Sequence, residues 1–271
     1  MPDLDDLVDL ARLRALLAEG TGMGVRIAVL DTGVDVAHPA LEGSVRSSYE
    51  VVRLGAKLAC RPAKGEDLVG HGTACAGIIH SVAPEAEMSS MRVIGKNAEG
   101  TGEQFIAGLR WAIDEKFDVV NLSLGTMQQR FRASLQELTE RAYFAGVLLV
   151  AAGNNQQAVS YPANFASLIA VDNHSFSDPL TFNFKTGQPV ELQAHGIYVR
   201  APSPGGNYQL WTGTSFACPH VTGIVARLRS VIPDLTALQA KALLWCLRAN
   251  REEPSVSGRQ AGAECRGGAT A

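Results

Sequence analysis

Short apolar runs alternate with amphipathic stretches along most of the chain. The run VRIAVL at 25–30 is apolar and β-branched, which fits a buried strand, and it ends at the Asp-Thr-Gly of 31–33. Strand and helix patterns then follow one another at 71–80 (helix), 88–94 (strand), 103–117 (helix), 118–124 (strand), 133–145 (helix), 147–153 (strand) and 167–172 (strand). This alternation predicts βαβ units. We therefore expect an α/β fold of three layers, with a mostly parallel central sheet flanked by helices on both faces.

The ends of the chain and the stretch 175–212 depart from this alternation. Apolar positions recur at helical spacing over 4–17, which predicts an amphipathic helix that packs on its own domain or contacts a partner. Turn signals break 175–212 into hairpins and loops, and two helices follow, one from about Ser215 and one capped by Asp234 or Thr236. The last residues are rich in Gly, Ala and polar side chains, which indicates disorder. We expect an N-terminal helix in 1–20, one domain in 21–250 and a disordered tail in 251–271.

The composition narrows the classes of partner and the location. The 271 residues carry a formal net charge of −3, and no stretch concentrates Lys and Arg. Nucleic-acid binding and a polybasic membrane anchor are therefore not indicated, and a peptide or protein is the expected partner. The start MPDLDDLVDL is acidic where a secretory signal is basic, and no apolar run approaches the ~20 residues of a membrane span. The five cysteines show no CxxC spacing and mostly lie in apolar segments, as reduced thiols do, so we expect a cytoplasmic protein.

Three residues carry candidate chemistry: Asp31 at the end of its strand, and His71 and Ser215 each at the start of a helix. Taken singly, each has a structural explanation, namely a turn for Asp31, a capping or core position for His71 and a helix cap for Ser215. Together they supply what nucleophilic catalysis requires, because a serine hydroxyl needs an imidazole to take its proton and a carboxylate to orient that imidazole. The order Asp, His, Ser differs from the order in α/β-hydrolases and in chymotrypsin-like proteases.

Five segments resemble the subtilisin-like serine proteases (subtilases) in order and approximate spacing, over about residues 22–248. They are IAVLDTGVDVAHPAL (27–41), HGTACAG (71–77), VVNLSLG (119–125), VAAGNN (150–155) and GTSFACPHVTG (213–223). The resemblance implies the subtilisin-like three-layer fold and a triad of Asp31, His71 and Ser215, with Ser215 as the acylated nucleophile. It also implies that the Asn154 amide and the main-chain N–H of Ser215 stabilise the oxyanion. Two substrate-pairing segments are implied as well, Gly100-Thr101-Gly102 and Ser123-Leu124-Gly125, whose glycines let a peptide backbone come close.

The chain departs from the secreted members of that family in several places. Ala40 stands where they have a calcium-ligating aspartate, and the connection 80–87 is too short for their calcium loop, so we expect no strong calcium site there, no metal site and no cofactor. Only thirty residues precede Asp31, so we expect a small form without a propeptide, which either folds unaided or is trimmed from a larger precursor. Cys75 falls beside the expected triad and predicts sensitivity to mercurials. The insertion at 47–70 is too small for the helical lid of macrocyclising relatives, which favours hydrolysis over transfer to an amine.

The most direct expectation is a serine endopeptidase that works through an acyl-enzyme on Ser215. The segments 153–157 and 160–164, at the expected floor of the acylation pocket, hold no carboxylate, so uncharged side chains should be preferred. Two alternatives stay open: a protease dedicated to maturing one precursor peptide, and a catalytically restrained subtilase homologue that binds peptides. Other classes fit worse, since the Asp-Thr-Gly of aspartic proteases occurs once, the glycines of 20–24 precede a strand instead of following one, and no zinc-binding spacing is present.

Overall fold

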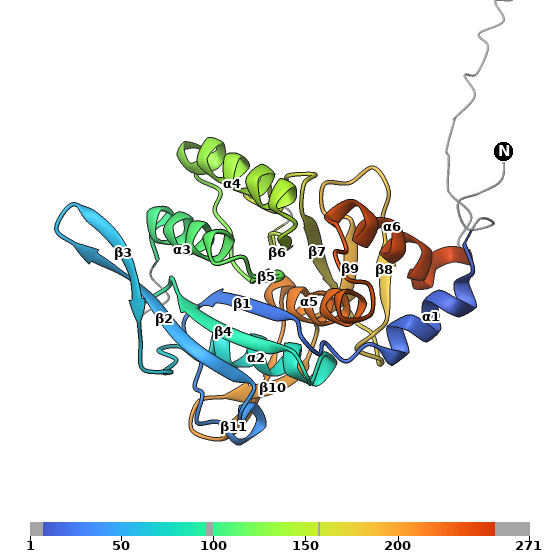
Figure 1. The fold of residues 1–271 in the computed structure, drawn as a ribbon, viewed down its shortest axis with the longest axis horizontal. Helices are drawn as coiled ribbons and strands as arrows, with labels where there is room; N and C mark the ends of the chain where they lie inside the picture. Colours follow the sequence, from blue (N-terminus) through green and yellow to red (C-terminus); the bar gives the residue numbers. More distant parts are fainter. Residues whose placement is uncertain (1–7, 96–99, 157, 253–271) are drawn as a thin grey trace, which may run out of the picture.

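A nine-stranded, mostly parallel sheet forms the centre of the molecule (Figure 1). The structure is a computed structural model that describes residues 8–95, 100–156 and 158–252. The strands of the sheet are β1 (Arg26–Asp31), β2 (Val45–Leu54), β3 (Lys57–Pro62), β4 (Glu87–Arg92), β5 (Val119–Leu122), β6 (Leu148–Ala152), β7 (Ile169–His174), β8 (Phe182–Phe184) and β9 (Leu192–His195). Their order is β3-β2-β4-β1-β5-β6-β7-β9-β8, and the pairs β2–β3 and β8–β9 at its two edges are antiparallel. The expected parallel α/β architecture is confirmed.

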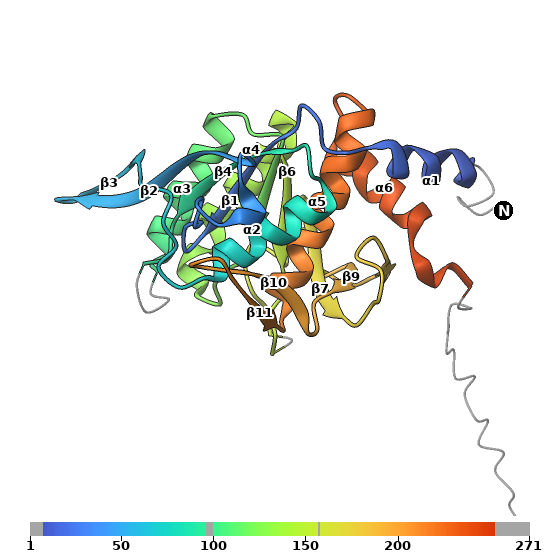
Figure 2. The same cartoon turned by 90° about the horizontal axis from the view of Figure 1, so that it is seen from below.

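Helices cover both faces of this sheet, which completes the three layers. They are α1 (Leu10–Glu19), α2 (His71–Val82), α3 (Gly102–Asp114), α4 (Arg132–Ala145), α5 (Thr214–Val231) and α6 (Ala237–Leu247). Figures 1 and 2 show α3 and α4 on one side of the sheet and α2 and α5 on the other, where α5 runs along the middle strands. No helix in the described ranges is long and apolar enough to span a membrane.

The side chains of the central strands divide the interior into two cores. Along β1, Ile27 and Val29 join the core under α2 and α5, whereas Ala28 and Leu30 join the core under α3 and α4. A strand whose successive side chains point to opposite faces must be apolar at every position when both faces are covered. The same division recurs along β6, and it explains why these strands read as continuous apolar runs in the sequence. Asp31 ends β1 directly after this buried stretch.

The N-terminal helix is shorter than the sequence pattern predicts. It begins at Leu10, with Asp9 as its N-cap accepting from the Arg12 main-chain N–H at 2.9 Å, and the expected positions 4–7 lie outside the described residues. Leu13 and Leu17 are buried where α1 packs against α5 and α6. The structure therefore places the apolar face of the described helix on its own domain.

A single side chain of α5 also fixes the ends of two neighbouring helices. The Arg227 guanidinium donates to the carbonyls of Leu17 and Ala18, in the last turn of α1, and to that of Val82, the last residue of α2. The bond lengths are 2.9, 2.8 and 2.9 Å. Gly20 allows this contact, because a Cβ there would lie 2.2 Å from the Arg227 carbonyl oxygen.

The segments that the sequence reads as hairpins and insertions take definite positions. The insertion 47–70 provides most of the β2–β3 hairpin, which extends one edge of the sheet and projects from the body in Figure 1. Strands β10 (Val199–Ser203) and β11 (Asn207–Trp211) form a separate antiparallel pair beside α2. Thr236, and not Asp234, caps α6 through a capping box with Gln239. The 3₁₀ turn Ala249–Glu252 extends two residues past the expected end of the domain at 250, and positions 253–271 of the expected tail lie outside the described residues.

Candidate active site

Asp31 and His71 meet because the start of α2 packs tightly on the turn that follows β1. Gly33 has a φ of 102°, in the left-handed region that favours glycine. Gly72 faces this turn, and a Cβ on it would lie 2.0 Å from the Gly33 carbonyl oxygen. Any side chain at Gly72 would therefore force the helix and the turn apart. The two glycines of the DTG and HGT motifs bring the first residue of α2 next to the last residue of β1.

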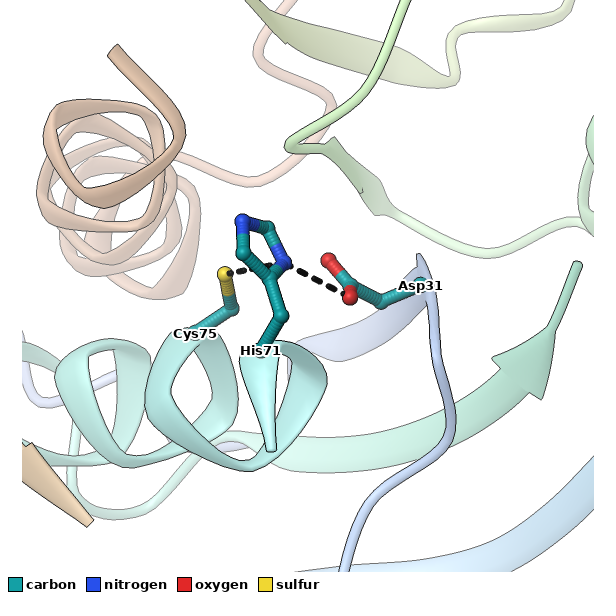
Figure 3. A group of neighbouring side chains, drawn as sticks. All are labelled: Asp31, His71 and Cys75. Carbon is teal, nitrogen blue, oxygen red and sulfur yellow. Dashed lines mark hydrogen bonds and ion pairs between the residues drawn. The ribbon is translucent and has the colours of Figure 1, made fainter. Parts of the chain in front are cut away.

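His71 donates from Nδ1 to Oδ1 of Asp31 over 2.8 Å (Figure 3). The carboxylate is buried, and the same oxygen also accepts from the main-chain N–H of Thr32 at 2.8 Å. Burial by itself disfavours the charged imidazole, but the Asp31 carboxylate and the neighbouring Cys75 sulfur outweigh it and raise the pKa of His71. The contact fixes the tautomer of the neutral ring, in which Nδ1 carries the proton and Nε2 is left as the base.

Cys75 lies one helical turn after His71 and is fully buried. Its sulfur is 3.9 Å from His71 Nδ1 and 3.5 Å from the main-chain carbonyl oxygen of Ser215. Burial raises the pKa of this thiol. Carboxylate, imidazole and thiol are also metal ligands, and these three ligand atoms lie within 4.8 Å of one another. However, the 2.8 Å contact between Nδ1 and Oδ1 leaves no room for an ion between those two atoms, so the arrangement fits proton sharing.

Ser215 is the second residue of α5, whose N-cap, Gly213, has no side chain to cap the helix. Its hydroxyl donates to the main-chain carbonyl of Ser123 at 3.0 Å, and the Ser123 hydroxyl donates back to the Ser215 carbonyl at 2.8 Å. The Ser215 hydroxyl therefore does not donate to His71 in this conformation. Rotation about the Ser215 Cα–Cβ bond is the change that would redirect it, and catalytic hydrogen bonds are often loose before substrate binds.

Asn154 follows β6 and lines the same pocket as Ser215. Its Oδ1 accepts from the main-chain N–H of Gln156 at 2.8 Å. Because a main-chain N–H can only donate, this contact identifies the oxygen and leaves the Nδ2 hydrogens free as donors. The main-chain N–H of Ser215 is one of the first-turn groups of α5 that have no partner within the helix. Both donors that the sequence predicts for an oxyanion are therefore available.

A pocket of about 450 Å³ opens beside Ser215 and Asn154. Ser123, Leu124 and Gly125 form one wall, and the hydrogen bonds between the main chains of Thr126 and Tyr161 connect that wall to the opposite loop. None of the described residues that line the pocket is charged. The residues 100–102 do not line this pocket. Thr101 instead caps α3 in a capping box with Gln104.

One of the glycines at 100–102 has a packing reason in addition to the predicted approach of a substrate backbone. A Cβ at Gly102 would lie 2.2 to 2.6 Å from ring atoms of Phe131, so packing alone requires a glycine there. Gly100 is less confined, because a Cβ would meet the Val93 carbonyl oxygen at 3.0 Å. Close approach of a substrate backbone is therefore not needed to explain Gly102.

Sequence reasoning did not find several residues that surround the triad. Asn155 accepts from the Thr214 main-chain N–H at 2.9 Å and so holds the start of α5. The Phe216 ring lies 5.1 Å from the His71 ring, and Trp211 stands edge-on to His71 at 6.4 Å between ring centroids. Asp67 bonds to the start of α2. Asp67 had a signal in the sequence, since it is a carboxylate four residues before His71, where a helix start attracts negative charge.

The comparisons with known proteins agree with this geometry. The model of the Subtilase family matches residues 22–260. Subtilisin Savinase of Lederbergia lenta is 34% identical over 232 residues, which is 82% of this chain and 82% of that protein. Subtilisin E of Bacillus subtilis (strain 168) is 32% identical, and the match covers 84% of this chain and 61% of that protein. M-protease of Shouchella clausii (strain KSM-K16) is 34% identical, and the chain spans 58% of its length.

Solved structures show the same fold. A cold adapted subtilisin-like serine proteinase matches with a TM-score of 0.72 and 30% sequence identity. The match covers 84% of this chain and 83% of that one.

Proposed function

Because the chain belongs to the subtilase family, we propose that it is a serine endopeptidase in which Ser215 attacks the carbonyl carbon of a peptide bond. The observation that carries the proposal is the 2.8 Å hydrogen bond from His71 to the buried Asp31. In the neutral ring that bond keeps the proton on Nδ1 and leaves Nε2 as the base, on a helix that packs beside the helix of Ser215. A base oriented in this way is what a serine nucleophile requires.

Acylation begins when His71 Nε2 takes the hydroxyl proton and the Ser215 oxygen bonds to the carbonyl carbon. The carbonyl oxygen becomes an anion, which the Asn154 Nδ2 hydrogens and the Ser215 main-chain N–H stabilise. His71 then gives its proton to the amine as the C–N bond breaks, which leaves an acyl group on Ser215. A water molecule, deprotonated by His71, attacks this ester, and the acid product leaves as the proton returns to Ser215. Asp31 remains ionised and stabilises the imidazolium in both steps.

The uncharged pocket beside Ser215 supports a preference for neutral side chains on the acyl side of the cleaved bond. Its volume of about 450 Å³ has room for a large residue, and its polar lining comes from amides and hydroxyls. A lysine or arginine would enter without a carboxylate to pair with, at the cost of its hydration. Main-chain groups of 100–102 and 123–125 would pair with the substrate as strands.

The thiols support a reducing location. Among the described residues, Cys60, Cys75 and Cys218 are free thiols, and the last two are buried. Disulfides are rare in the cytosol and frequent in exported proteins, so we extend the proposal to a cytoplasmic enzyme. Cell fractionation with an antibody to the chain tests this location, and recovery from the culture medium would contradict it.

One observation favours a second candidate, a restrained homologue that binds peptides without cleaving them. The Ser215 hydroxyl donates to Ser123 and not to the base. A fluorophosphonate probe separates the two candidates, because it labels only a serine that the base can activate. Labelling that requires both Ser215 and His71 supports the enzyme, and a lack of labelling supports the restrained form.

The deciding experiment is digestion of a peptide library, read by mass spectrometry. Cleavage by the wild type that disappears in Ser215→Ala supports the endopeptidase, and the products report the preferred side chain and any transfer to amines. A few cleaved sequences among many would indicate a dedicated maturation protease. Dominant cleavage after Lys or Arg would contradict the neutral pocket.

A further inference from the structure

We propose that Asp67 is a positioning residue, which holds the catalytic carboxylate and the catalytic base in register by linking the turn after β1 to the first turn of α2. The inference rests on the triad of the proposed function and adds a fourth side chain to it. Asp67 lies in the loop before α2, half-buried, and it touches neither the pocket nor the reacting atoms.

The start of α2 lacks a cap of its own. Gly70 occupies the N-cap position with a φ of 103° and has no side chain to accept from the exposed N–H groups of the first turn. Asp67 performs this function instead. Its Oδ1 accepts from the main-chain N–H groups of Val69 at 3.0 Å and Gly70 at 2.8 Å, and its Oδ2 accepts from the main-chain N–H of Thr73 at 2.8 Å and the Thr73 hydroxyl at 2.6 Å.

The same carboxylate also reaches the segment that carries Asp31. The Thr32 hydroxyl donates to Asp67 Oδ1 at 2.7 Å and accepts from the main-chain N–H of Gly72 at 3.0 Å. The main-chain N–H of Thr32 donates to Asp31 Oδ1, the oxygen that His71 contacts. Two hydrogen bonds thus lead from Asp67 to the catalytic carboxylate, and the helix that it caps begins with the catalytic base.

An ordinary helix cap does not have this second connection. Asp67 accepts five hydrogen bonds in all, three from the main chain and two from hydroxyls. An amide in its place has one accepting atom, and its NH₂ group faces donors on the other side. Asp67→Asn therefore keeps the size of the side chain but leaves donors of either Thr32 or Thr73 without an acceptor. The expected result is a small displacement between Asp31 and His71, and displacements of about 1 Å can cost about 10²-fold in rate.

The first test is kinetic. Asp67→Asn should lower kcat by about 10- to 100-fold with KM within about twofold of wild type, because the pocket is not touched. Active sites are counted by fluorophosphonate titration, so that an unfolded fraction does not count as slow enzyme. Asp35→Asn is the matched control. Among the described residues, the Asp35 carboxylate accepts from the main-chain N–H groups of Ala37 and Gly205 and from none in α2. Its main-chain N–H donates to the Thr73 hydroxyl, a bond that the substitution keeps, so kcat should match wild type.

The second test does not depend on activity. The Nδ1 proton of His71 lies in a 2.8 Å hydrogen bond to a buried carboxylate, so it should give a proton NMR resonance far downfield of other ring protons. Asp67→Asn should move this resonance upfield or abolish it, and Asp35→Asn should leave it in place. Thr32→Val removes the connecting hydroxyl but leaves the Asp67 cap, so it should shift the resonance in the same direction. The double variant should cost less than the sum of the two single effects, because both cut one connection.

These measurements test the role of Asp67 even if one of the variants does not fold. A wild-type resonance in folded Asp67→Asn overturns it, whatever happens to kcat. If Asp67→Asn does not fold, a wild-type resonance and kcat in Thr32→Val overturn it. A wild type with no peptidase activity would contradict the proposed function, while the resonance comparison would still test the position of Asp67.

Discussion

The two halves of the candidate site are held in different ways. Asp31 and His71 are fixed by side-chain hydrogen bonds that run through Thr32 to Asp67. Ser215 and Asn154 depend on main-chain positions at the ends of α5 and β6, and the Ser215 hydroxyl is bonded to Ser123 and not to the base. The Asp31–His71 half is therefore already arranged for proton transfer. In the other half, the Ser215 hydroxyl must first give up its hydrogen bond to the Ser123 carbonyl. The difference indicates that substrate binding acts mainly on the serine side.

The largest effect should come from removing the nucleophile of one half or the base of the other. Ser215→Ala and His71→Ala should each lower kcat by at least about 10⁴-fold, because either change removes the activated nucleophile. The double variant should be no slower than the worse single variant, since the residues act as one unit. Steady-state kinetics on one peptide substrate would check this. Additive losses would show that the two halves work independently.

The oxyanion donor should have the next largest effect. Asn154→Ala should lower kcat by about 10²–10³-fold, the range known for this donor in subtilisin, a relative of this chain. KM should change little, because the amide faces charge that develops during the reaction. Asn155→Ala is a useful comparison, since that side chain holds the Thr214 main-chain N–H and makes no oxyanion contact in the proposed mechanism. A similar loss in both variants would mean that Asn154 acts by holding the loop.

The pH dependence of kcat/KM should report on the Asp31–His71 half, because only that half contains a titrating base beside a buried carboxylate. The Asp31 carboxylate raises the pKa of His71 above its usual value near 6.5, and the base works only when neutral. The limb on which kcat/KM rises with pH should therefore have its midpoint above 6.5. Asp31→Asn removes the charge and should move the midpoint down while lowering the plateau. A midpoint that stays in place would show that Asp31 does not set the proton affinity of the base.

The smallest expected effect concerns only α5, the helix that carries Ser215: a buried histidine on it should make the free energy of unfolding fall in acid. His220 is buried on α5, its Nδ1 donates to the Phe216 carbonyl at 2.8 Å, and burial lowers its pKa to about 4. Between pH 6.5 and 4 the unfolded chain takes up this proton and the folded chain does not. The free energy of unfolding should therefore decrease as the pH is lowered from 6.5 to 4, by about 1.4 kcal/mol per pH unit and by a few kcal/mol in all.

Urea unfolding at several pH values measures that slope. His220→Gln should flatten it between pH 6.5 and 4, whereas the same change at the exposed His174 should not. An unchanged slope in His220→Gln would assign the acid sensitivity to other groups.

Much of the fold could be predicted because the central strands are apolar on both faces. Runs such as 25–30 and 147–153 identify a buried parallel strand without further information, and the DTG, HGT and GTS motifs mark the strand and helix ends where Asp31, His71 and Ser215 lie. The predicted start of α1 was wrong. The apolar periodicity extends to residues before Asp9, whereas the helix begins at Leu10, with the Asp9 side chain as its N-cap.

The contacts around the triad could not be predicted in the same way. Asp67 reaches Thr32 across 35 positions of the chain, and only the folded turn brings the two together. The packing of Gly102 on the ring of Phe131, which comes from a different segment, was not predicted either. The partner of the Ser215 hydroxyl depends on a rotation about one bond, to which sequence patterns are insensitive.

The contacts of Arg227 have a consequence for the electrostatics of α2. A helix carries partial positive charge at its first residue and partial negative charge at its last, and α2 begins with the catalytic base. The guanidinium neutralises the negative ends of α1 and α2 together. One cation thus holds α1 on the domain and compensates the negative end of α2, at the opposite end of that helix from His71.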